Sequence, residues 1–261
     1  MRDDGRMQAQ PEAGVNRASA WGFMPASNFR TRRSALSGAQ QRTWDRLWPV
    51  LGRQVRAHSE DGAAPAPAEP GPLDTTPLNT QAWFGRDAPL VLEIGCGNGA
   101  STLAMAQAEP DVDVIAVEIY RRGLAQLLCA IEREGVDNIR LIRGNAVDVL
   151  QELLTPASLT GVRVFFPDPW PKARHHKRRL LQPGTVALIA DRLSPGGVLH
   201  AATDHANYAE HIAAVGDAEP ALRRADPTDA LPISAVRPTT KYENKAHDVG
   251  STINEFVWVR T

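Results

Sequence analysis

The feature that most constrains the fold of this chain is the alternation, from Leu90 onward, of short apolar runs with longer segments of helical spacing. Such alternation is typical of a parallel sheet with helices on both faces, and it predicts an α/β fold. We predict strands over residues 90–94, 114–118, 139–143, 162–166, 197–203 and 253–259. We predict helices over residues 99–108, 121–134, 147–154, 183–193 and 207–215.

The chain divides by composition into four segments. A polar start without periodicity predicts a disordered or flexible basic arm, and a later Ala/Pro-rich stretch predicts a linker. Between them, apolar side chains at helical spacing predict an amphipathic helix over residues 40–55, which Pro49 interrupts or restarts. The predicted boundaries are residues 1–34 for the arm, 35–58 for the N-terminal helical segment, 59–88 for the linker and 89–261 for the α/β domain.

Composition narrows the class of protein. With 261 residues, of which 43% are hydrophobic, the chain can bury one sizeable core but not two large ones. Cys96 and Cys129 lie far apart and form no Cys-x-x-Cys pair, so we expect neither a disulfide framework nor a metal site. The sequence has no signal-peptide pattern and no long apolar stretch, so we expect a soluble cytoplasmic protein without a membrane partner.

The predicted strand over residues 162–166 runs directly into a carboxylate held between two prolines, Pro167 and Pro169. Proline fixes the backbone angle φ and restricts the residue before it, so Asp168 is expected on a nearly inflexible turn. A turn-capping aspartate is the structural alternative. Its place at a strand end, directly before a basic run, favours a position at the rim of an active site.

A basic segment follows this turn and favours a polyanionic partner. The net charge of −1 would not by itself suggest nucleic acid, but the positive charges are clustered. A solvated surface is the alternative interpretation of such a run. The residues of the segment are Lys172, Arg174, His175, His176, Lys177, Arg178 and Arg179.

A glycine cluster follows the first predicted strand of the domain. Glu93 lies inside the end of that strand, and Gly95 and Gly97 would let a ligand approach the backbone closely. The next strand ends at Glu118, where a carboxylate can bind ribose hydroxyls. The pattern predicts a nucleoside-cofactor site, but Gly95-x-Gly97-x-x-Ala100 also fits a loose dinucleotide fingerprint, so a nicotinamide or flavin enzyme is a rival.

Three residues favour a cofactor other than a dinucleotide. Glu93 would repel a pyrophosphate but can receive an ammonium group. Asn145, after the third strand, can read an adenine edge through its amide. Asp168 ends the fourth strand, where a transferred group would be presented.

Together these segments resemble the bacterial tRNA (guanine-N7-)-methyltransferases, over about residues 28–261. The resemblance implies a Rossmann-like class I methyltransferase fold, with a mostly parallel seven-stranded sheet and helices on both faces. It implies methyl transfer from S-adenosylmethionine to N7 of guanine 46 in the variable loop of tRNA. The segments that carry it are Glu93-x-Gly-x-Gly-x-Gly, Glu118, Pro-Asp-Pro-Trp-x-Lys with its basic tail, Thr203-Asp204 and Thr240-Lys241-Tyr242-Glu243.

The resemblance also assigns roles by position. The cofactor positions are Glu93, Gly95, Gly97, Glu118, Asn145 and Asp168, and Asn145 stands where the family generally has Asp. The substrate positions are Lys172, Asp204, Thr240, Lys241, Tyr242 and Glu243. The RNA-contacting stretch is Arg174, His175, His176, Lys177, Arg178 and Arg179. A monomer and a homodimer fit these residues equally.

Asp168 is the candidate catalytic residue. Guanine N7 has a lone pair and no proton, so methyl transfer to it needs no general base, and alignment should dominate the rate. A fixed carboxylate near the purine would stabilise the positive charge that develops there. The competing hypotheses are a nicotinamide-dependent oxidoreductase and a non-catalytic RNA-binding module with a methyltransferase-like fold.

Overall fold

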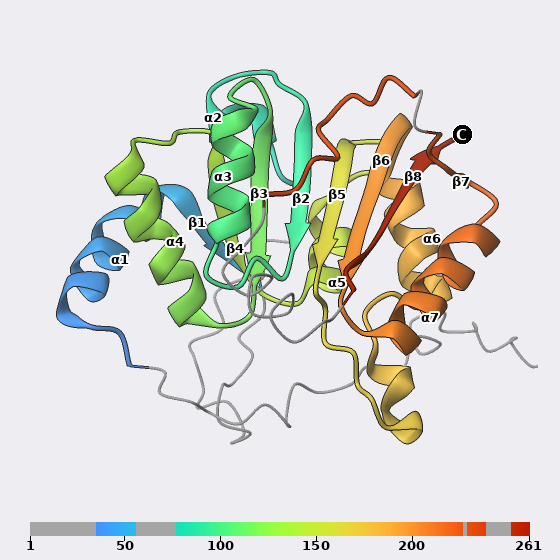
Figure 1. Cartoon of the computed structure of the whole chain (residues 1–261). Helices are drawn as coiled ribbons and strands as arrows, with labels where there is room; N and C mark the ends of the chain where they lie inside the picture. Colours follow the sequence, from blue (N-terminus) through green and yellow to red (C-terminus); the bar gives the residue numbers. More distant parts are fainter. Residues whose placement is uncertain (1–34, 56–76, 227–228, 239–251) are drawn as a thin grey trace, which may run out of the picture.

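The computed structural model describes residues 35–55, 77–226, 229–238 and 252–261. The predicted arm over residues 1–34 and most of the predicted linker lie outside this part of the chain, as do the substrate positions at residues 240–243. The described residues form one twisted sheet with helices on both faces (Figure 1).

The sheet has eight strands in the order β1-β4-β3-β2-β5-β6-β8-β7. The pairings from β1 through β6 are parallel, and β8 pairs antiparallel with both β6 and β7. The strands are β1 (Gly52–Gln54), β2 (Leu90–Ile94), β3 (Asp113–Glu118), β4 (Ile139–Arg143), β5 (Leu159–Phe165), β6 (Leu193–Thr203), β7 (Leu222–Arg224) and β8 (Asn254–Arg260).

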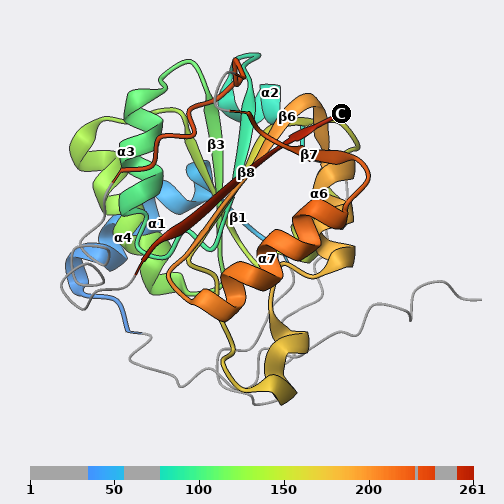
Figure 2. The ribbon, with the colours of Figure 1, turned by 45° about the vertical axis from the view of Figure 1, so that its right-hand side comes forward.

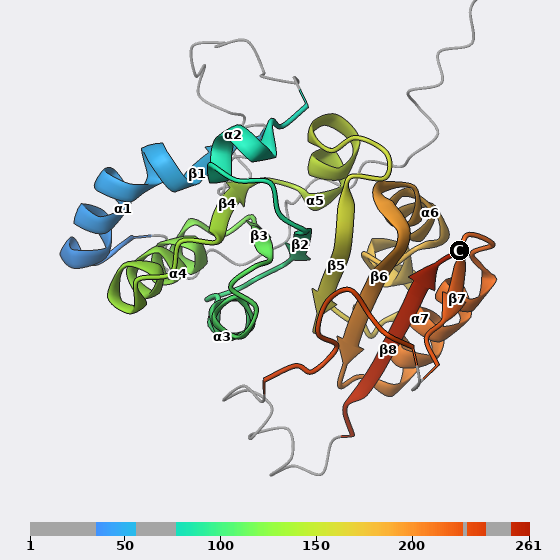
Figure 3. The same cartoon turned by 90° about the horizontal axis from the view of Figure 1, so that it is seen from above.

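Helices cover both faces of the sheet, as Figure 3 shows from above. One face packs against α1, α3 and α4, and the other packs against α5, α6 and α7. In the described ranges, no helix has both the length and the apolar character to cross a membrane. The helices are α1 (Gly38–Leu51), α2 (Thr80–Phe84), α3 (Ala100–Ala108), α4 (Arg121–Glu134), α5 (Ala146–Asp148), α6 (Pro183–Arg192) and α7 (Ala206–Ala218), with a π-helical turn at Val149–Leu153 and a 3-10 helix at Ala173–Arg178.

The predicted α/β fold is confirmed, and each of the six predicted strands is present. The central strands β2 and β3 are buried along their whole length, because a parallel strand between two helical layers has no solvent-facing side. The sheet has eight strands rather than seven. The sequence did not predict β1 and β7, which are three-residue edge strands with mostly exposed or half-exposed side chains.

The N-terminal helix α1 confirms the predicted amphipathic face. Trp44 is buried, and its ring stacks on Trp48 with 4.1 Å between centroids. Pro49 lies inside the last turn, and the helix ends at Leu51 rather than continuing to residue 55. The chain turns at Gly52, where a Cβ atom would lie 2.2 Å from the Trp48 ring, and then joins the sheet as β1 beside β4.

Two other predictions differ from the structure in detail. The predicted helix over residues 147–154 is a short α5 followed by a π-helical turn. A short helix, α2, lies within the predicted linker, where Asn79 caps it by accepting a hydrogen bond from the Ala82 N–H. Trp83 and Phe84 of this helix pack against the core, and that burial explains why a segment without long periodicity is ordered.

The topology brings the predicted polar residues to one edge of the sheet. Because β2, β3, β4, β5 and β6 are parallel, their carboxyl ends meet along a single edge. The strand order reverses between β2 and β5, and ligands in doubly wound sheets bind outside the carboxyl ends at such a point. The residues that end or follow these strands are Glu93, Glu118, Asn145, Asp168 and Asp204.

Packing of α7 on β8 gives a testable prediction. A Cβ atom at Gly216 would lie 2.2 Å from the buried Trp258 ring, and the Trp258 Nε1–H also donates to Asp217 Oδ1 at 3.0 Å. We expect Gly216→Ala to lower the free energy of unfolding by about 1–3 kcal/mol, because the ring or the helix must move. Urea denaturation would measure this change.

Gly38→Ala is the matched control for that experiment. Its Cβ atom would meet only Arg42 Nη1, at an ordinary 3.6 Å, at the start of α1. Alanine also favours the helix, so no loss of stability is expected there. An unchanged unfolding midpoint for Gly216→Ala would contradict the described contact with Trp258.

Candidate active site

The glycine loop after β2 leaves room for a ligand. Gly95 and Gly97 have positive φ angles of 77° and 58°, and nothing lies within 4 Å of a Cβ atom built on either residue. Gly99 differs, because a Cβ atom there would lie 2.5 Å from Leu127 of α4. Two glycines therefore keep the space above the loop open, and the third lets α3 and α4 pack closely.

Glu118 ties this loop to the end of β3. Its Oε2 atom accepts a hydrogen bond from the Gly97 N–H at 2.9 Å, and its Oε1 atom accepts from the N–H groups of Ile119 and Tyr120 at 2.8 and 3.0 Å. Burial raises the pKa of this carboxyl, and the three hydrogen bonds oppose that shift. An ionised carboxylate has about four acceptor sites, so about one remains for a ligand hydroxyl.

Gly123 of α4 also shapes the loop, and it was not among the predicted site residues. A Cβ atom at Gly123 would lie 2.1 Å from the carbonyl oxygen of Gly97, which is backbone and cannot easily move aside. The start of α4 therefore packs directly against the loop. The sequence did contain a sign of this contact: Gly123 stands inside a helical pattern, where a glycine often allows close packing.

Glu93 presents a carboxylate oxygen without an internal partner. The residue is only 3% exposed, and its Oε2 atom has no hydrogen-bond partner among the described residues. Burial raises the pKa of Glu93 to about 7, although the Thr102 hydroxyl and the Arg163 guanidinium oppose the shift. A buried acceptor without a partner beside an open loop is a suitable contact for a cationic ligand group.

A buried arginine lies beside Glu93 in the sheet, and it too was not predicted. Arg163 on β5 pairs in register with Glu93 on β2 and is fully buried. Its Nη2 atom donates to Glu109 Oε2 at 2.5 Å. The sequence did contain a sign of this pair: Arg163 stands inside an apolar run, and a buried arginine needs an acidic partner. Its positive charge favours the ionised form of Glu93.

Asn145 caps α5 at the carboxyl end of β4. Its Oδ1 atom accepts a hydrogen bond from the Val147 N–H at 2.8 Å, so one acceptor site of the amide is used within the protein. The cap fixes the amide plane. The second acceptor site of this oxygen and the NH₂ group remain for the predicted contact with an adenine edge.

Asp168 lies exposed on the predicted turn at the end of β5. The Phe166 N–H donates to the Ala202 carbonyl at 2.8 Å, and both Phe166 and Trp170 have positive φ angles, of 50° and 44°. Partial loss of water raises the pKa of the Asp168 carboxyl. Because β5 pairs with β2, Asp168 lies at the same edge of the sheet as the glycine loop, and its charge also raises the pKa of Glu118.

Arg179 departs from the predicted RNA contact. The residue is only 3% exposed, and its Nε and Nη2 atoms donate to the Pro169 carbonyl and to Asn207 Oδ1 at 2.9 and 2.7 Å. Its guanidinium also lies 4.8 Å from the centre of the Tyr208 ring. Arg179 therefore holds the turn that carries Asp168 in place, and burial makes it unavailable to a nucleic acid.

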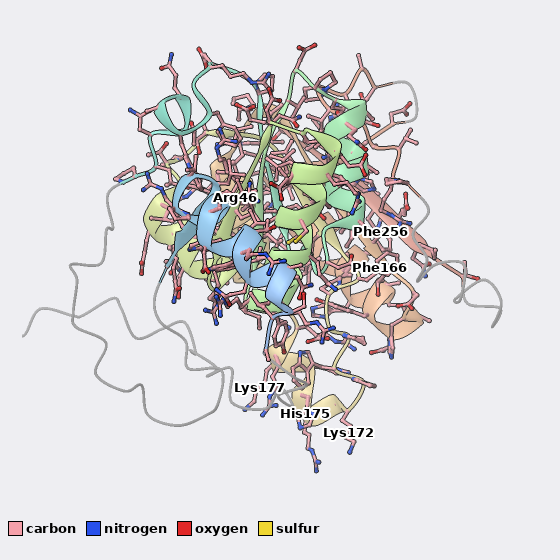
Figure 4. All side chains as sticks on the ribbon, turned by 90° about the vertical axis from the view of Figure 1, so that its left-hand side faces the viewer. Arg46, Phe166, Lys172, His175, Lys177 and Phe256 are labelled. Atoms are coloured by element: carbon pink, nitrogen blue, oxygen red, sulfur yellow. The ribbon has the colours of Figure 1, made fainter. Side chains whose placement is uncertain are left out.

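The rest of the basic segment forms a 3-10 helix that projects from the molecule. Lys172, Arg174 and Lys177 are exposed, and Figure 4 shows Lys172, His175 and Lys177 at the lower end of the view. Partial burial lowers the pKa of His175, and the surrounding cations lower it further. At neutral pH the charge of this surface therefore comes from its lysines and arginines.

The Trp170 side chain packs against residues of this segment. His175 meets the Trp170 ring edge to face with 5.8 Å between centroids, and the Arg178 guanidinium lies 5.1 Å from the ring centre. His176 is half-buried. The segment is thus a folded projection with an aromatic centre, not an extended charged loop.

The remaining predicted substrate position that the structure describes is Asp204. It directly follows β6, is exposed, and lies at the same edge of the sheet as Asp168. The predicted positions Thr240, Lys241, Tyr242 and Glu243 fall outside the described residues. The described site therefore combines an open glycine loop, three carboxyl groups with raised pKa values and an exposed basic projection.

Comparisons with known proteins identify a matching family and similar proteins. Residues 87–256 match the family described as "Putative methyltransferase". Among solved structures, the 16S rRNA (adenine(1408)-N(1))-methyltransferase from Catenulisporales acidiphilia is 15% identical, with a TM-score of 0.48, over 71% of this chain and 95% of that chain.

Two curated relatives match nearly the whole chain. The tRNA (guanine-N(7)-)-methyltransferase of Mycobacterium ulcerans (strain Agy99) is 63% identical over 280 residues, which cover 99% of this chain and 99% of the relative. That of Mycobacterium avium (strain 104) is 69% identical over 254 residues, which cover 97% of this chain and 94% of the relative. The chain therefore belongs to the tRNA (guanine-N7-)-methyltransferase family, and its fold is the Rossmann-like fold of class I methyltransferases.

Proposed function

We propose that this protein transfers a methyl group from S-adenosylmethionine to N7 of a guanine in tRNA. One observation carries the proposal: a buried carboxyl with an unpartnered oxygen lies beside an open glycine loop, at the same sheet edge as an exposed basic projection. The glycine loop and the carboxyl suit a cationic nucleoside cofactor, and the projection suits a polyanion. Family membership supports the same substrate and the same cofactor.

The residues at this edge fit S-adenosylmethionine by the chemistry of their donors and acceptors. Glu93 has a free buried oxygen for the ammonium group, and Glu118 has about one acceptor site for a ribose hydroxyl. Asn145 offers its NH₂ group to the adenine edge, and Gly95 and Gly97 leave space for close approach. When bound, the cofactor supplies an electrophilic methyl group on a positively charged sulfur.

Asp168 is the proposed catalytic residue. Guanine N7 has no proton to remove, so the chain needs to align the base and to stabilise the charge that the purine gains. The two prolines and Arg179 hold Asp168 on a fixed turn, and its carboxylate needs no reorganisation as charge develops. Asp204 lies at the same edge and is proposed to help hold the guanine.

The proposed RNA surface consists of the exposed cations beside the Asp168 turn. Lys172 is the cation closest in sequence to that turn and is proposed to contact the substrate, with Arg174 and Lys177 binding phosphates farther out. Residues 240–243 remain proposed substrate contacts, and guanine 46 remains the proposed target. RNA substrates are selected by shape as well as by base edges, so the projection is expected to contact the folded tRNA and not one base.

The direct test of the activity uses labelled S-adenosylmethionine with unmodified tRNA, unmodified 16S rRNA and duplex DNA as separate acceptors. Transfer to tRNA alone is the expected result. Tight cofactor binding without transfer to any acceptor would favour the RNA-binding module. Binding of NAD(H) in preference to S-adenosylmethionine would favour the oxidoreductase.

The role of Asp168 predicts a large effect on the chemical step. We expect Asp168→Ala to lower the single-turnover rate at saturating cofactor and tRNA by about 100-fold or more, as for removal of other groups that stabilise developing charge. Asp137→Ala, an exposed aspartate in the turn between α4 and β4, is the control and should react at the wild-type rate. A wild-type rate for a folded Asp168→Ala protein would rule out the catalytic role.

The approach of α4 to the glycine loop predicts a binding defect. We expect Gly123→Ala to weaken binding of S-adenosylmethionine by about tenfold or more, which corresponds to about 1.4 kcal/mol, because the new methyl group pushes on Gly97. Isothermal titration calorimetry would measure the dissociation constant. Gly216→Ala is the matched control: it is overpacked against a side chain far from the loop and should bind the cofactor normally.

The raised pKa of Glu93 predicts that cofactor binding depends on pH. Because the pKa is about 7, the carboxyl of the free protein is mostly protonated at about pH 6, whereas an ammonium group is best received by the carboxylate. The affinity for S-adenosylmethionine should therefore fall by up to about tenfold per pH unit as the pH drops below 7. It should change little between about pH 7.5 and 8.

Glu93→Gln separates this effect from other titrating groups. The variant should bind more weakly than the wild type at about pH 7.5, and its affinity should no longer change between pH 6 and 7.5. Calorimetric titrations of both proteins at the two pH values would decide. If Glu93→Gln retained the full pH dependence, another group, such as Glu118, would be responsible.

A further inference from the structure

We propose that Arg237 and Glu255 are positioning residues for Asp168. They are not among the proposed cofactor contacts, and they act on the turn through Phe165 and Phe166. The inference deepens the proposed function and rests on it, because it concerns the same catalytic carboxylate. None of these four side chains was among the predicted site residues.

Two hydrogen bonds join the Arg237 side chain to Glu255 on β8. Its Nε and Nη2 atoms donate to Glu255 Oε1 at 2.9 and 2.7 Å, and its side chain is only 5% exposed. His200 Nε2 lies 3.6 Å from Glu255 Oε2, beyond the usual hydrogen-bond range, so Arg237 is the closer partner. His200 and Arg237 lower the pKa of Glu255 to about 2, and the pair stays ionised at neutral pH.

The segment that carries Arg237, residues 229–238, packs over β5 on the same face of the sheet as α3 and α4. Figures 1 and 2 show it in red, running in front of the sheet toward α3. The Ser234 N–H donates to Glu109 Oε1 at 2.6 Å, and Ile233 lies over Gly161, where a Cβ atom would be 2.2 Å from Ile233 Cδ1. The segment is thus anchored before it reaches Arg237.

The guanidinium of Arg237 contacts two successive aromatic rings. Its Cζ atom lies 5.6 Å from the ring centre of Phe165 and 4.9 Å from that of Phe166. Successive side chains of a strand point to opposite faces, so one group can reach both only if the backbone changes direction between them. Phe166 does this with a φ angle of 50°, which is rare for a bulky residue. The cation favours this conformation by holding both rings.

The backbone conformation of Phe166 determines where Asp168 lies, because only Pro167 separates the two residues. Pro167 is the residue between them, and its ring fixes φ, while Pro169 restricts the backbone of Asp168 from the other side. Few torsions are therefore free between the Phe166 ring and the Asp168 carboxylate. Loss of the Arg237 contact should let Phe166 relax and move that carboxylate, and a misplacement of about 1 Å can lower a rate about 100-fold.

The chain contains a matched control of the same chemistry in another place. Arg224 on β7 donates through Nε and Nη2 to Asp217 at 2.6 and 2.9 Å, and its Cζ atom lies 5.3 and 5.5 Å from the rings of Phe256 and Trp258. The contact joins the edge of the sheet to α7 and does not touch the Asp168 turn. Arg237→Gln and Arg224→Gln therefore remove the same kind of contact.

The experiment compares these two variants in the full chain. For Arg237→Gln we expect a decrease in the single-turnover methylation rate of at least about tenfold, at saturating tRNA and cofactor, with the dissociation constant of S-adenosylmethionine within about twofold of the wild type. Arg224→Gln should keep the wild-type rate and lower the melting temperature less, because Arg224 and Asp217 are about half exposed. Arg237→Lys retains the charge but not the planar fork, so it should recover only part of the rate.

A second measurement does not depend on the acceptor. The carboxyl carbon of Asp168, followed by carbon NMR against pH, should titrate at lower pH in Arg237→Gln, because a loosened turn exposes the carboxyl to water, and should be unchanged in Arg224→Gln. Should Arg237→Gln fail to fold, Glu255→Gln makes the same test. Equal rates and equal titrations for the two arginine variants would overturn the inference. If wild-type protein methylates no tRNA, the proposed function fails, and the titration still decides the positioning role.

Discussion

The site depends on the hydrogen bonds that the Glu118 carboxylate accepts, one of which comes from the glycine loop. One carboxylate at the end of β3 accepts N–H groups from Gly97, Ile119 and Tyr120, and so joins the loop after β2 to the start of α4. The loop can then follow positive φ angles without side chains, and α4 can approach it at Gly123. Burial of this acid is costly, and the three hydrogen bonds offset that cost.

Charge is separated across the carboxyl edge of the sheet. The carboxyl groups of Glu93, Glu118 and Asp168 all lie at this edge, and loss of water raises the pKa of each. Lysines and arginines project beside them on a 3-10 helix. An acidic interior favours a cationic cofactor, and a basic rim favours a polyanion, so each ligand is steered to its own part of the site. The buried Arg179 does not contribute to the basic rim. It fixes the turn that carries Asp168.

The sequence predicted the parts of the structure that local pattern determines. Fully buried strands such as β2 and β3 read as apolar runs, and the polar residues that end them were recognised because parallel strands share a carboxyl edge. It did not predict features that depend on tertiary contacts. Strand β1 forms because the chain turns at Gly52 over the Trp48 ring. Arg179 is buried against Tyr208. Arg237 contacts Phe166, which lies about 70 residues earlier in the chain. Gly123 and Arg163 are unusual in their local sequence, one as a glycine in a helix and the other as an arginine in an apolar strand. The sequence could not show that they contact the glycine loop and Glu93.

The most direct measurement for the account is methylation of two transcripts of one tRNA that differ only at position 46, a guanine in one and an adenine in the other. After reaction with labelled S-adenosylmethionine, the tRNA is digested to nucleosides and the product is identified by mass spectrometry. The account predicts N7-methylguanosine from the guanine transcript and no transfer to the other. Equal transfer to both transcripts would contradict the proposed target, and a labelled nucleoside other than N7-methylguanosine would contradict the proposed reaction.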